Sequence, residues 1–482
     1  MKTSLTKKIV AGVFFATLSL AMASCSKEEE SLTENGLAPK SAQALDACGC
    51  ERPYAQTITL PQIINANMTL SCSNLYLLSG KVYVTNGATL TIPAGTRIEG
   101  IYNADPVNAS ALVITKGAKI EAQGTATCPI VFSGHIDATN PVLSTGDWGG
   151  LVLLGKAPVN AGTSGIIEGI DSSIVPVGVD PTYGGSDSAD DSGTLSYVRV
   201  EYAGASIAAN NELNSFTFGG VGTGTQLDHL QSYSGADDSF EFFGGTVNAT
   251  YLISTAANDD AFDFDLGYTG NLQFLVAVLD ANHDYSANAN GIECDNNPAG
   301  STTSTLTHPV ISNLTVVGTS TGATSSPGTG TVLYATHFRK NTRLTLRNSV
   351  FYGYATASFL DSSVYPSLST NKANSHVNTA SVFEDNVIGK ISTGAWTNTG
   401  WTVSSTNSLV ADTNTALGIN NPYSYANFFV STSKPLRAFA APSNSGADFT
   451  GLVGFTSTTY KGALTNANYW ITDTWVNTAF PL

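Results

Sequence analysis

The sequence predicts an all-β protein whose main body is a right-handed parallel β-helix, followed by a β-rich C-terminal cap. Residues 237–242 (DDSFEF) and 259–264 (DDAFDF) are near copies set 22 residues apart. Within each copy, hydrophobic residues alternate with polar ones, which is typical of strands. A repeat of about 20 to 25 residues suits a solenoid, because each coil buries its apolar edge only against its neighbours.

The composition also favours a folded, turn-rich β protein. Only 12% of the 482 residues are charged, while 42% are hydrophobic and 46 are glycines. Disorder requires low hydrophobicity, so this composition argues against it. The net charge is −16, and an acidic surface repels nucleic acid, which excludes that class of partner. Cations and neutral sugars remain suitable ligands.

The first 24 residues have the features of a secretion signal. Two lysines precede an apolar run at residues 9–22, which is shorter than a membrane span requires. The run ends in residues 22–25 (MASC), which resemble a bacterial lipobox. The resemblance implies that Cys25 becomes the lipidated first residue after cleavage and anchors the protein to the outer membrane. An ordinary signal peptide cut near Ala23 is the alternative.

Residues 26–30 (SKEEE) resemble the acidic tag of Bacteroidetes lipoproteins that are exported to the cell surface. The resemblance implies a surface-exposed lipoprotein. A solvated charge run in a flexible tether that faces the periplasm is the alternative. Residues 31–47 are small and polar, as a tether should be. The predicted divisions are a signal peptide (1–24), a lipid-anchored tether (25–54), a parallel β-helix (55–365) and a β-rich C-terminal region or cap (366–482).

Five further cysteines fit an exported protein, in which disulfides are permitted. Cys48, Cys50, Cys72 and Cys128 can form two bridges in three alternative pairings. Such bridges would hold the first end of the solenoid together. Cys294 is left over, and its place in the repeat predicts a buried, unreactive thiol.

The β-helix region contains repeated coils. Residues 81–92 and 111–120 each read as a strand, a tight turn at Asn-Gly or Lys-Gly, and a second strand. Further along, one apolar strand position recurs with spacings of 32, 22, 23, 39 and 36 residues. This position falls at Val198, Leu230, Leu252, Leu275, Leu314 and Val350. The minimum coil is therefore 22 residues, and the longer spacings indicate loops at the turns. Right-handedness follows from the general preference of parallel crossovers.

The chain fits this repeat poorly from about residue 365 onward, although it stays rich in Thr and Asn. Aromatic residues mark its tail at Phe455, Tyr460, Trp470, Trp475 and Phe480. This tail resembles the closing motif of a poorly characterised group of secreted and lipid-anchored β-helix proteins common in Bacteroidetes, as do residues 147–151 (DWGGL) and 190–193 (DDSG). The resemblance implies the fold and an envelope location, but no agreed activity. Independently, we expect the aromatic side chains to cover the open end of the last coil.

Acidic residues recur in register along these coils. In the second strand of each coil, apolar residues alternate with Glu241, Asp263 and Glu293, so the three acids form one column on the outer face. Residues 237–238 and 259–260 add acids where the strands begin. Adjacent coils lie about 4.8 Å apart, and two charges at that spacing repel by roughly 3 kcal/mol at an effective dielectric near 20. The alignment needs an explanation.

Three explanations are open. A hard cation, with Ca²⁺ as the best candidate, would collect oxygens from adjacent coils. Its candidate ligands are Asp237, Asp238, Glu241, Asp259, Asp260, Asp263 and Glu293. Alternatively, one acid of each pair has a raised pKa and serves in acid–base catalysis. The third explanation is a solvated acidic face, on which screening makes the repulsion small.

The catalytic explanation depends on a resemblance to family 28 polygalacturonases, which carry acidic, His and Arg/Lys motifs in the same order on successive coils. The corresponding residues of this chain are Asp238, Asp259, Asp260, His283, Arg339 and Lys340. The resemblance implies that Asp238 or Asp260 is the general acid and that the partner acids activate water. The sequence departs from the family around His283 and in the spacing of Arg339 and Lys340. A lyase that uses Ca²⁺, with Arg339 or Lys340 as its base, is a further alternative.

A binding role is the third class of function. Tyr285, Tyr334 and Tyr354 would offer stacking surfaces for sugars beside the acids. We expect an outer-membrane lipoprotein at the cell surface with a binding or structural role rather than a catalytic one. Its expected partners are the membrane, through the lipid on Cys25, and a glycan or another envelope protein. The alternative is a polysaccharide hydrolase or lyase that uses the acids of residues 237–263.

Overall fold

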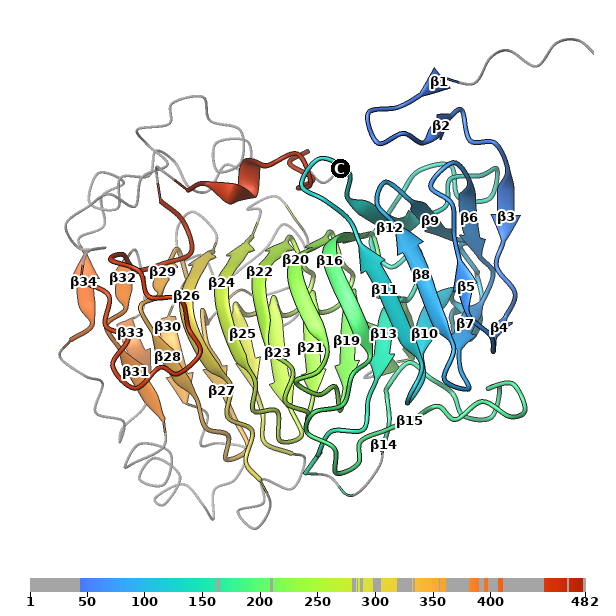
Figure 1. The fold of residues 1–482 in the computed structure, drawn as a ribbon. Coiled ribbons are helices and arrows are strands. Elements are labelled where there is room, and N and C mark those ends of the chain that lie inside the picture. The colour runs from blue at the N-terminus through green and yellow to red at the C-terminus, as the bar shows by residue number, and fades with distance from the viewer. Residues whose placement is uncertain are drawn as a thin grey trace, which may run out of the picture. The chain divides into compact units, whose positions relative to one another are not determined.

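Short strands joined by tight turns make up almost all of the regular structure (Figure 1). The computed structural model describes residues 44–479 except 161, 163–164, 209–210, 280–282, 284, 287–288, 298–304, 319–331, 333, 355, 361–380, 390–393, 398–405, 411–445 and 466–467. The helical segments in the described part include two short 3₁₀ turns, η1 (Pro106–Asn108) and η5 (Trp470–Thr472). No helix among the described residues is long and apolar enough to cross a membrane.

Two long sheets contain most of the strands in the described part of the chain. The first has eleven strands: β4 (Ile63–Ile64), β7 (Lys81–Val84), β10 (Ala111–Ile114), β13 (Gly150–Leu154), β19 (Phe216–Gly219), β21 (Phe240–Phe243), β23 (Phe262–Asp265), β25 (Ile292–Cys294), β27 (His337–Phe338), β30 (Thr356–Leu360) and β33 (Gly394–Thr397). We call it the 11-stranded sheet.

The second, the 17-stranded sheet, contains β3 (Thr57–Thr59), β5 (Met68–Thr69), β6 (Leu75–Leu78), β8 (Thr89–Pro93), β9 (Arg97–Gly100), β11 (Lys119–Gln123), β12 (Ile130–Gly134), β16 (Gly193–Glu201), β20 (Gln226–Tyr233), β22 (Ala249–Thr255), β24 (Asn271–Val278), β26 (Val310–Val317), β28 (Thr345–Arg347), β29 (Val350–Tyr352), β31 (Val382–Glu384), β32 (Val387–Gly389) and β34 (Ser408–Val410). Three antiparallel pairs lie outside these sheets: β1 (Ala44–Leu45) with β2 (Glu51–Arg52), β14 (Gly165–Ile166) with β15 (Thr182–Tyr183), and β17 (Ser206–Ala208) with β18 (Asn211–Glu212).

The strand pairs described within the two long sheets are parallel, and each strand pairs with strands of the coils before and after it. In the 11-stranded sheet, for example, β21 pairs with β19 on one side and with β23 on the other. In the 17-stranded sheet, β22 lies between β20 and β24. The chain therefore alternates between the sheets, and a coil adds one strand to the 11-stranded sheet and one or more, such as β8 and β9, to the 17-stranded sheet. This is a parallel β-helix, as predicted.

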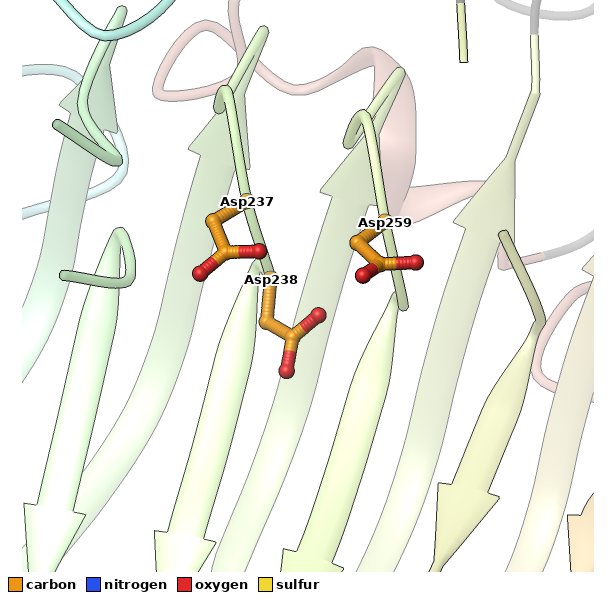
Figure 2. Close-up of side chains that lie close together, drawn as sticks. All are labelled: Asp237, Asp238 and Asp259. Carbon is orange, nitrogen blue, oxygen red and sulfur yellow. The ribbon is translucent and has the colours of Figure 1, made fainter. Parts of the chain in front are cut away.

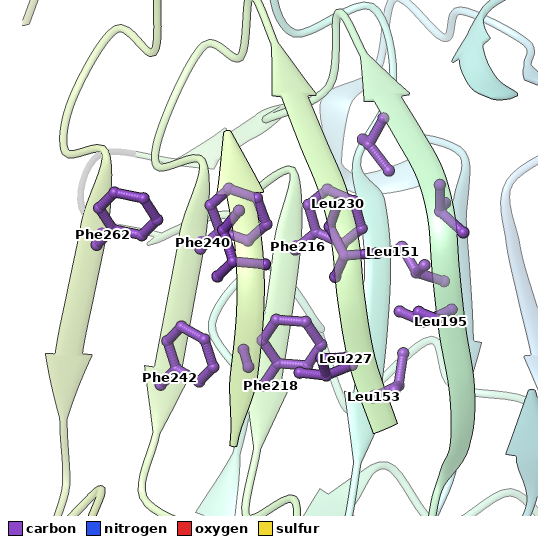
Figure 3. Packing of buried hydrophobic residues seen from close by; sticks show 14 of the residues in the cluster. Leu151, Leu153, Leu195, Phe216, Phe218, Leu227, Leu230, Phe240, Phe242 and Phe262 are labelled. Atoms are coloured by element: carbon purple, nitrogen blue, oxygen red, sulfur yellow. The ribbon is translucent and has the colours of Figure 1, made fainter. Parts of the chain in front are cut away.

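The core lies between the two sheets because the inward side chains of each coil stack on those of the next. Phe216, Phe240 and Phe262 form one such row, with ring centroids 4.9 and 5.5 Å apart. Figure 3 shows this row beside leucines such as Leu230. Aligned identical positions thus become stacked, nearly parallel rings, and each coil shields the apolar edge of its neighbour.

The long strands of the 17-stranded sheet bend at one corner position. Tyr197, His229, Tyr251 and Phe274 occupy this corner on successive coils, with φ between 51° and 60°. A left-handed conformation is uncommon for such large residues. Their rings stack outside the core, with centroids 4.3, 4.3 and 4.9 Å apart. Repetition of the same corner on neighbouring coils thus produces a second, external stack.

The predicted register is confirmed along most of the stack. Val198, Leu230, Leu252, Leu275 and Leu314 are paired strand to strand, and all five are buried in the central core. The prediction for Val350 is wrong by one residue, because Val350 pairs with Thr315 and packs outside that core. The buried residue Ser349 takes the position beside Leu314 and accepts a hydrogen bond from its backbone N–H. A polar residue at an inward position is invisible to a search for apolar repeats.

The first coils are held by two disulfides, Cys48–Cys128 and Cys50–Cys72, with Cα–Cα distances of 5.6 and 5.3 Å. This selects one of the three pairings that the sequence left open. Cys294 is a buried free thiol, as predicted, and its Sγ lies 3.0 Å from Oγ1 of Thr342. Burial raises the pKa of this thiol well above its usual value, which makes the thiolate form rare.

The parallel ladder continues past residue 365, where the sequence suggested that the β-helix ends. β31 pairs with β28, β32 with β29, and β34 with β32. β33 extends the 11-stranded sheet in the same way. The irregular spacing of this region weakens the sequence pattern, but the described segments still add strands to both sheets.

Residues 446–465 and 468–479, here called the C-terminal strap, run back along the outside of the 17-stranded sheet (red in Figure 1). The amide of Asn348 donates to the backbone oxygen of Asp448, and Asn313 donates to that of Tyr460. Near the other end, the side chain of Gln231 donates to the backbone oxygen of Asn477. The strap therefore follows the stack toward earlier coils.

The expectation that Trp470 and Trp475 cover the open end of the last coil is wrong. Both rings pack edge-on against the external aromatic stack, Trp475 at 5.5 Å from His229 and Trp470 at 5.2 Å from Tyr251. The corner column provides a flat aromatic surface in the middle of the stack, and both tryptophan side chains are buried against it.

Candidate cation site

The seven acids predicted as cation ligands lie on three successive coils of the 11-stranded sheet. We call them the acidic cluster: Asp237, Asp238, Glu241, Asp259, Asp260, Asp263 and Glu293. The 22-residue repeat becomes a one-coil step, since Phe240 pairs with Phe262 and Glu241 with Asp263. Each coil therefore presents its acids at the same height as the next.

Glu241, Asp263 and Glu293 form the outward column that the sequence predicted. They are neighbours across β21, β23 and β25, with Thr217 before them on β19 and His337 after them on β27. However, the solvated-face explanation is wrong for Glu241 and Glu293, which are only 5% and 8% exposed, whereas Asp263 between them is partly exposed. Outward direction and exposure to water are different properties here.

A cover over the outer face of the 11-stranded sheet accounts for this burial. Most outward side chains on β7, β10 and β13 are apolar, and they pack against residues 165–183 and the segment around β17 and β18. Leu213, which follows β18, is completely buried in this contact. At the edge of the cover, Asn214 donates a hydrogen bond to Glu241. Burial raises the pKa of Glu241, and the charge of Glu168 nearby raises it further. The cover thus reaches the first acidic strand.

Residues 238 and 260 form a second column, in which each side chain holds the next coil. Oδ1 of Asn214 accepts a hydrogen bond from the backbone N–H of Asp238, at 3.1 Å. Oδ1 of Asp238 accepts from the N–H of Asp260 at 2.7 Å, and Oδ1 of Asp260 from the N–H of Asn290 at 2.6 Å. These two acids therefore have a structural role as coil-to-coil acceptors, in addition to any ligand role.

The carboxylates of the cluster approach one another in three overlapping triads, whose ligand oxygens lie within 4.8 Å of each other. Figure 2 shows the first, made of Asp237, Asp238 and Asp259. The second is made of Asp238, Glu241 and Asp263, and the third of Asp260, Asp263 and Glu293. Oxygens bound to one Ca²⁺ at about 2.4 Å can be no more than roughly twice that distance apart, and each triad meets this limit.

Burial and mutual repulsion disfavour the ionised form of these acids. Burial raises the pKa of Asp238 and of Asp263 well above its usual range, and neighbouring carboxylates, Asp237 and Glu293 respectively, raise it further. Burial and neighbouring carboxylates also raise the pKa of Glu241 and of Asp260 well above the usual range. Without a bound cation, these acids hold protons at pH values where ordinary carboxylates are ionised.

Two oxygens of the outward column lack a hydrogen-bond partner among the described residues: Oδ1 of Asp263 and Oγ1 of Thr217. Thr217 is fully buried and precedes Glu241 in the outward column. A buried polar oxygen without a partner costs about 1–3 kcal/mol. A cation bound between Glu241 and Asp263 would give both of these oxygens a positively charged partner. The residues present therefore fit a hard ion.

Arg339 and Lys340 lie beside Glu293 and Asp295, at the end of the cluster on β25. Both side chains form ion pairs with these acids, so neither is a free base. Nε and one terminal nitrogen of Arg339 donate to the two oxygens of Asp295, each at 2.8 Å, and Arg339 also pairs with Glu293. Lys340 pairs with Asp295 as well. Burial acts to lower the pKa of Lys340, but the charge of Asp295 and its hydrogen bond with Lys340 together raise it above its usual value, which makes Lys340 a poor base.

The remaining catalytic candidates are less well placed. The ring of His283 lies against Asn258 and Tyr285. Asp259 accepts a hydrogen bond from Oγ of Ser286 at 2.7 Å. The acids in each triad are closer than the roughly 6.5–9.5 Å that an inverting glycosidase requires between its carboxyl groups. The spacing within each triad therefore does not match an inverting mechanism, and it suits a shared cation.

The expected sugar-stacking surface is wrong for two of its three tyrosines. Tyr285 and Tyr354 are buried. Tyr334 is partly exposed, and its ring centroid lies 5.0 Å from that of His337. Alternation in an irregular loop does not tell inward from outward tyrosines, so the sequence could not separate these cases.

Sequence reasoning missed Glu168, Asn214 and Thr217. Asn214 and Thr217 had a usable signal, because aligning residues 216–218 with residues 240–242 places them opposite Asp238 and Glu241. No comparable signal exists for Glu168, which lies in a long insertion outside the repeat. Only the folded cover brings it to the cluster.

A family model described as a pectate-lyase like beta helix domain matches residues 62–428. The matched range includes the acidic cluster and extends from the first coils to beyond β34. Searches of curated proteins and of solved structures returned no match. Since the match covers most of the chain and the structure has the corresponding parallel coils, this protein belongs to the pectate-lyase-like β-helix domain family.

Proposed function

We propose that this protein is a lipid-anchored outer-membrane β-helix protein, exposed at the cell surface, that binds Ca²⁺ in its acidic cluster. Its role is binding or structural, toward a glycan or another envelope protein. The family description supports a carbohydrate-related role. The buried triads of carboxylates support the ion, and the sequence at residues 22–30 supports the anchor and the address.

One observation carries the cation proposal: buried and partly buried acids of adjacent coils have ligand oxygens within 4.8 Å of one another, beside oxygens that have no partner among the described residues. Like charges at this distance destabilise the fold unless they are protonated or neutralised. Ca²⁺ prefers several carboxylate oxygens at 2.3–2.6 Å and tolerates irregular geometry. Mg²⁺ demands a near-octahedral set and retains water, so it fits this buried, irregular cluster less well.

Metal analysis and thermal unfolding test the cation. Purified full-length protein should contain Ca²⁺ after gel filtration, and chelation with EDTA should lower its melting temperature. Added Ca²⁺ should restore the melting temperature, whereas the same concentration of Mg²⁺ should restore less. No Ca²⁺ in the protein, together with a melting temperature that EDTA leaves unchanged, would refute the proposal.

The anchor and the address need separate experiments, since residues 1–43 lie outside the described part of the chain. A Cys25→Ala variant should lose incorporation of labelled palmitate and leave the membrane fraction. Protease added to intact cells should degrade the wild-type mature chain if it is displayed at the surface. Protection in intact cells, with degradation after outer-membrane permeabilisation, would place it in the periplasm instead.

A polysaccharide hydrolase or lyase is the second candidate, favoured by the family match. It predicts new reducing ends or unsaturated products from an acidic or neutral polysaccharide. Asp260→Asn should abolish them, because Asn retains the coil-to-coil acceptor Oδ1 but has no carboxylate. Activity that survives this substitution would remove the acidic cluster as the active site.

A further inference from the structure

The geometry points to a specific role for Arg339: its guanidinium takes the position of a third cation and so limits the acidic cluster to two. This inference rests on the proposed Ca²⁺ function and extends it, by naming the residue that sets how many ions the cluster accepts. It follows from the order of the three triads and from what lies at each end of them.

The triads form a row along the direction in which the coils stack. The first two share Asp238 and the last two share Asp263. Because the shared acids lie on adjacent strands, each triad is displaced from the next by part of one coil. The row therefore has a first end, at Asp237, and a last end, at Glu293. The negative charge of the acids is balanced by different neighbouring groups at the two ends.

At the last end, protein cations already supply positive charge. Arg339 pairs with Glu293, which belongs only to the third triad, and forms a two-pronged contact with Asp295, the residue just after the same strand. The backbone fixes this position, because Arg339 follows β27 and its N–H donates to the oxygen of Cys294 at 3.0 Å. A guanidinium held in this way satisfies carboxylates as an ion would.

At the first end, the neighbouring groups are neutral or acidic. Asn214 and Thr217 come from the preceding coil, and Glu168 comes from the cover. In the described ranges, no Lys or Arg forms an ion pair with a member of the first two triads. The oxygens without partners, Oγ1 of Thr217 and Oδ1 of Asp263, are in or beside the second triad. Arg339 also acts on Asp259 and Asp263 through its charge, but its described ion pair with a triad acid is with Glu293, in the third triad.

Lys340 provides a matched control for Arg339. It is the next residue in the chain and also pairs with a buried acid. Its partner is Asp295, however, which belongs to none of the triads. Removing Lys340 takes away the same formal charge without opening any triad, so the two substitutions separate a local effect from a general electrostatic one.

Calorimetric titration of the EDTA-stripped full chain with Ca²⁺, checked by metal analysis, tests the inference. The wild type should bind two Ca²⁺ per chain, Arg339→Gln three, and Lys340→Gln two. Adding Glu293→Gln to Arg339→Gln should return the count to two, because it removes a ligand of the third triad. An unchanged count in Arg339→Gln, or an equal increase in Lys340→Gln, would overturn the role of Arg339.

Glu293→Gln alone keeps the inference testable if Arg339→Gln does not fold. In the presence of Arg339 this variant should still bind two Ca²⁺, and a lower count would mean that the third triad already holds an ion. Failure of the proposed function looks different, since the wild type would then bind no Ca²⁺. If the wild type binds no Ca²⁺ but Arg339→Gln binds one, the role of Arg339 is supported and the proposed Ca²⁺ function is not. If neither protein binds Ca²⁺, both the role of Arg339 and the proposed function are rejected.

Discussion

The backbone N–H of Asp260 donates a hydrogen bond to Oδ1 of Asp238, with an N···O distance of 2.7 Å. Asp238 therefore holds the next coil with one oxygen, while its carboxylate belongs to two of the three triads. Asn214 holds Asp238 by the same kind of bond. An amide can thus replace the acid in the first role, but not in the second.

Substitutions at Asp238 should separate these two roles. Asp238→Asn should retain the fold and weaken Ca²⁺ binding by roughly tenfold or more, equivalent to about 1.4 kcal/mol. Asp238→Ala should also lower the free energy of unfolding by about 1–3 kcal/mol, because the N–H of Asp260 loses its acceptor. Urea denaturation in EDTA and titration with Ca²⁺ measure the two effects. Equal stability of the Asn and Ala variants would contradict the structural role.

The stability of the metal-free protein should fall as pH rises from about 4 to 7. Burial and the charge of Asp295 raise the pKa of Asp265 to about 7, and burial raises that of Asp238 and Glu241 well above the usual range. Unfolded carboxylates release their protons near pH 4, so between these values the folded state holds more protons than the unfolded state. Rising pH then favours unfolding.

Melting temperatures measured from pH 4.5 to 7.5 test this pH dependence. In EDTA they should decrease across the range, whereas saturating Ca²⁺ should remove or reverse the decrease, because the ion binds the ionised acids. A metal-free melting temperature that increases toward pH 7.5 would show that the cluster is not the main titrating element of the fold.

The C-terminal strap should be an integral part of the fold. Trp475 is completely buried against Tyr197 and His229, so Trp475→Ala should lower the free energy of unfolding by about 3–5 kcal/mol. Val453 lies in the same strap but is 84% exposed, and Val453→Ala should change stability by less than about 0.5 kcal/mol. Chemical denaturation compares the pair. Similar small changes in both would mean that the strap detaches at little cost.

The two disulfides should contribute unequally. Cys48–Cys128 closes a loop of 80 residues and Cys50–Cys72 one of 22. On the chain-entropy account, the longer loop stabilises by roughly 1 kcal/mol more. The Cys48→Ser/Cys128→Ser variant should therefore unfold at lower denaturant than Cys50→Ser/Cys72→Ser, and a reducing agent should remove the difference. The opposite order would indicate that local contacts of the first coil dominate.

The repeat made much of this structure predictable from the sequence. Two near-copies 22 residues apart were enough to place Phe240 over Phe262 and Glu241 beside Asp263, because parallel coils convert sequence offset into stacking. The burial of Glu241 could not be predicted in this way. It depends on Glu168 and Asn214, and the cover that carries Glu168 interrupts the repeat.

The sequence also did not predict where irregular segments pack on the folded β-helix. Nothing in the spacing of Trp470 and Trp475 indicates that they pack in the middle of the stack rather than at its end. That outcome depends on the left-handed corners at residues 197, 229, 251 and 274, which turn large rings outward into one column. Corner conformation is set by backbone geometry that alternation of apolar residues does not encode.

The strap also determines the order in which the molecule can be completed. Gln231 bonds to Asn477 and Arg199 to the backbone oxygen of Trp475, across 246 and 276 residues of chain. A polypeptide that emerges from its N-terminal end can wind coil upon coil as it appears, yet these contacts must wait for the last few dozen residues. A chain interrupted before residue 446 would therefore leave an aromatic column facing water, and quality-control proteases could recognise it as unfinished.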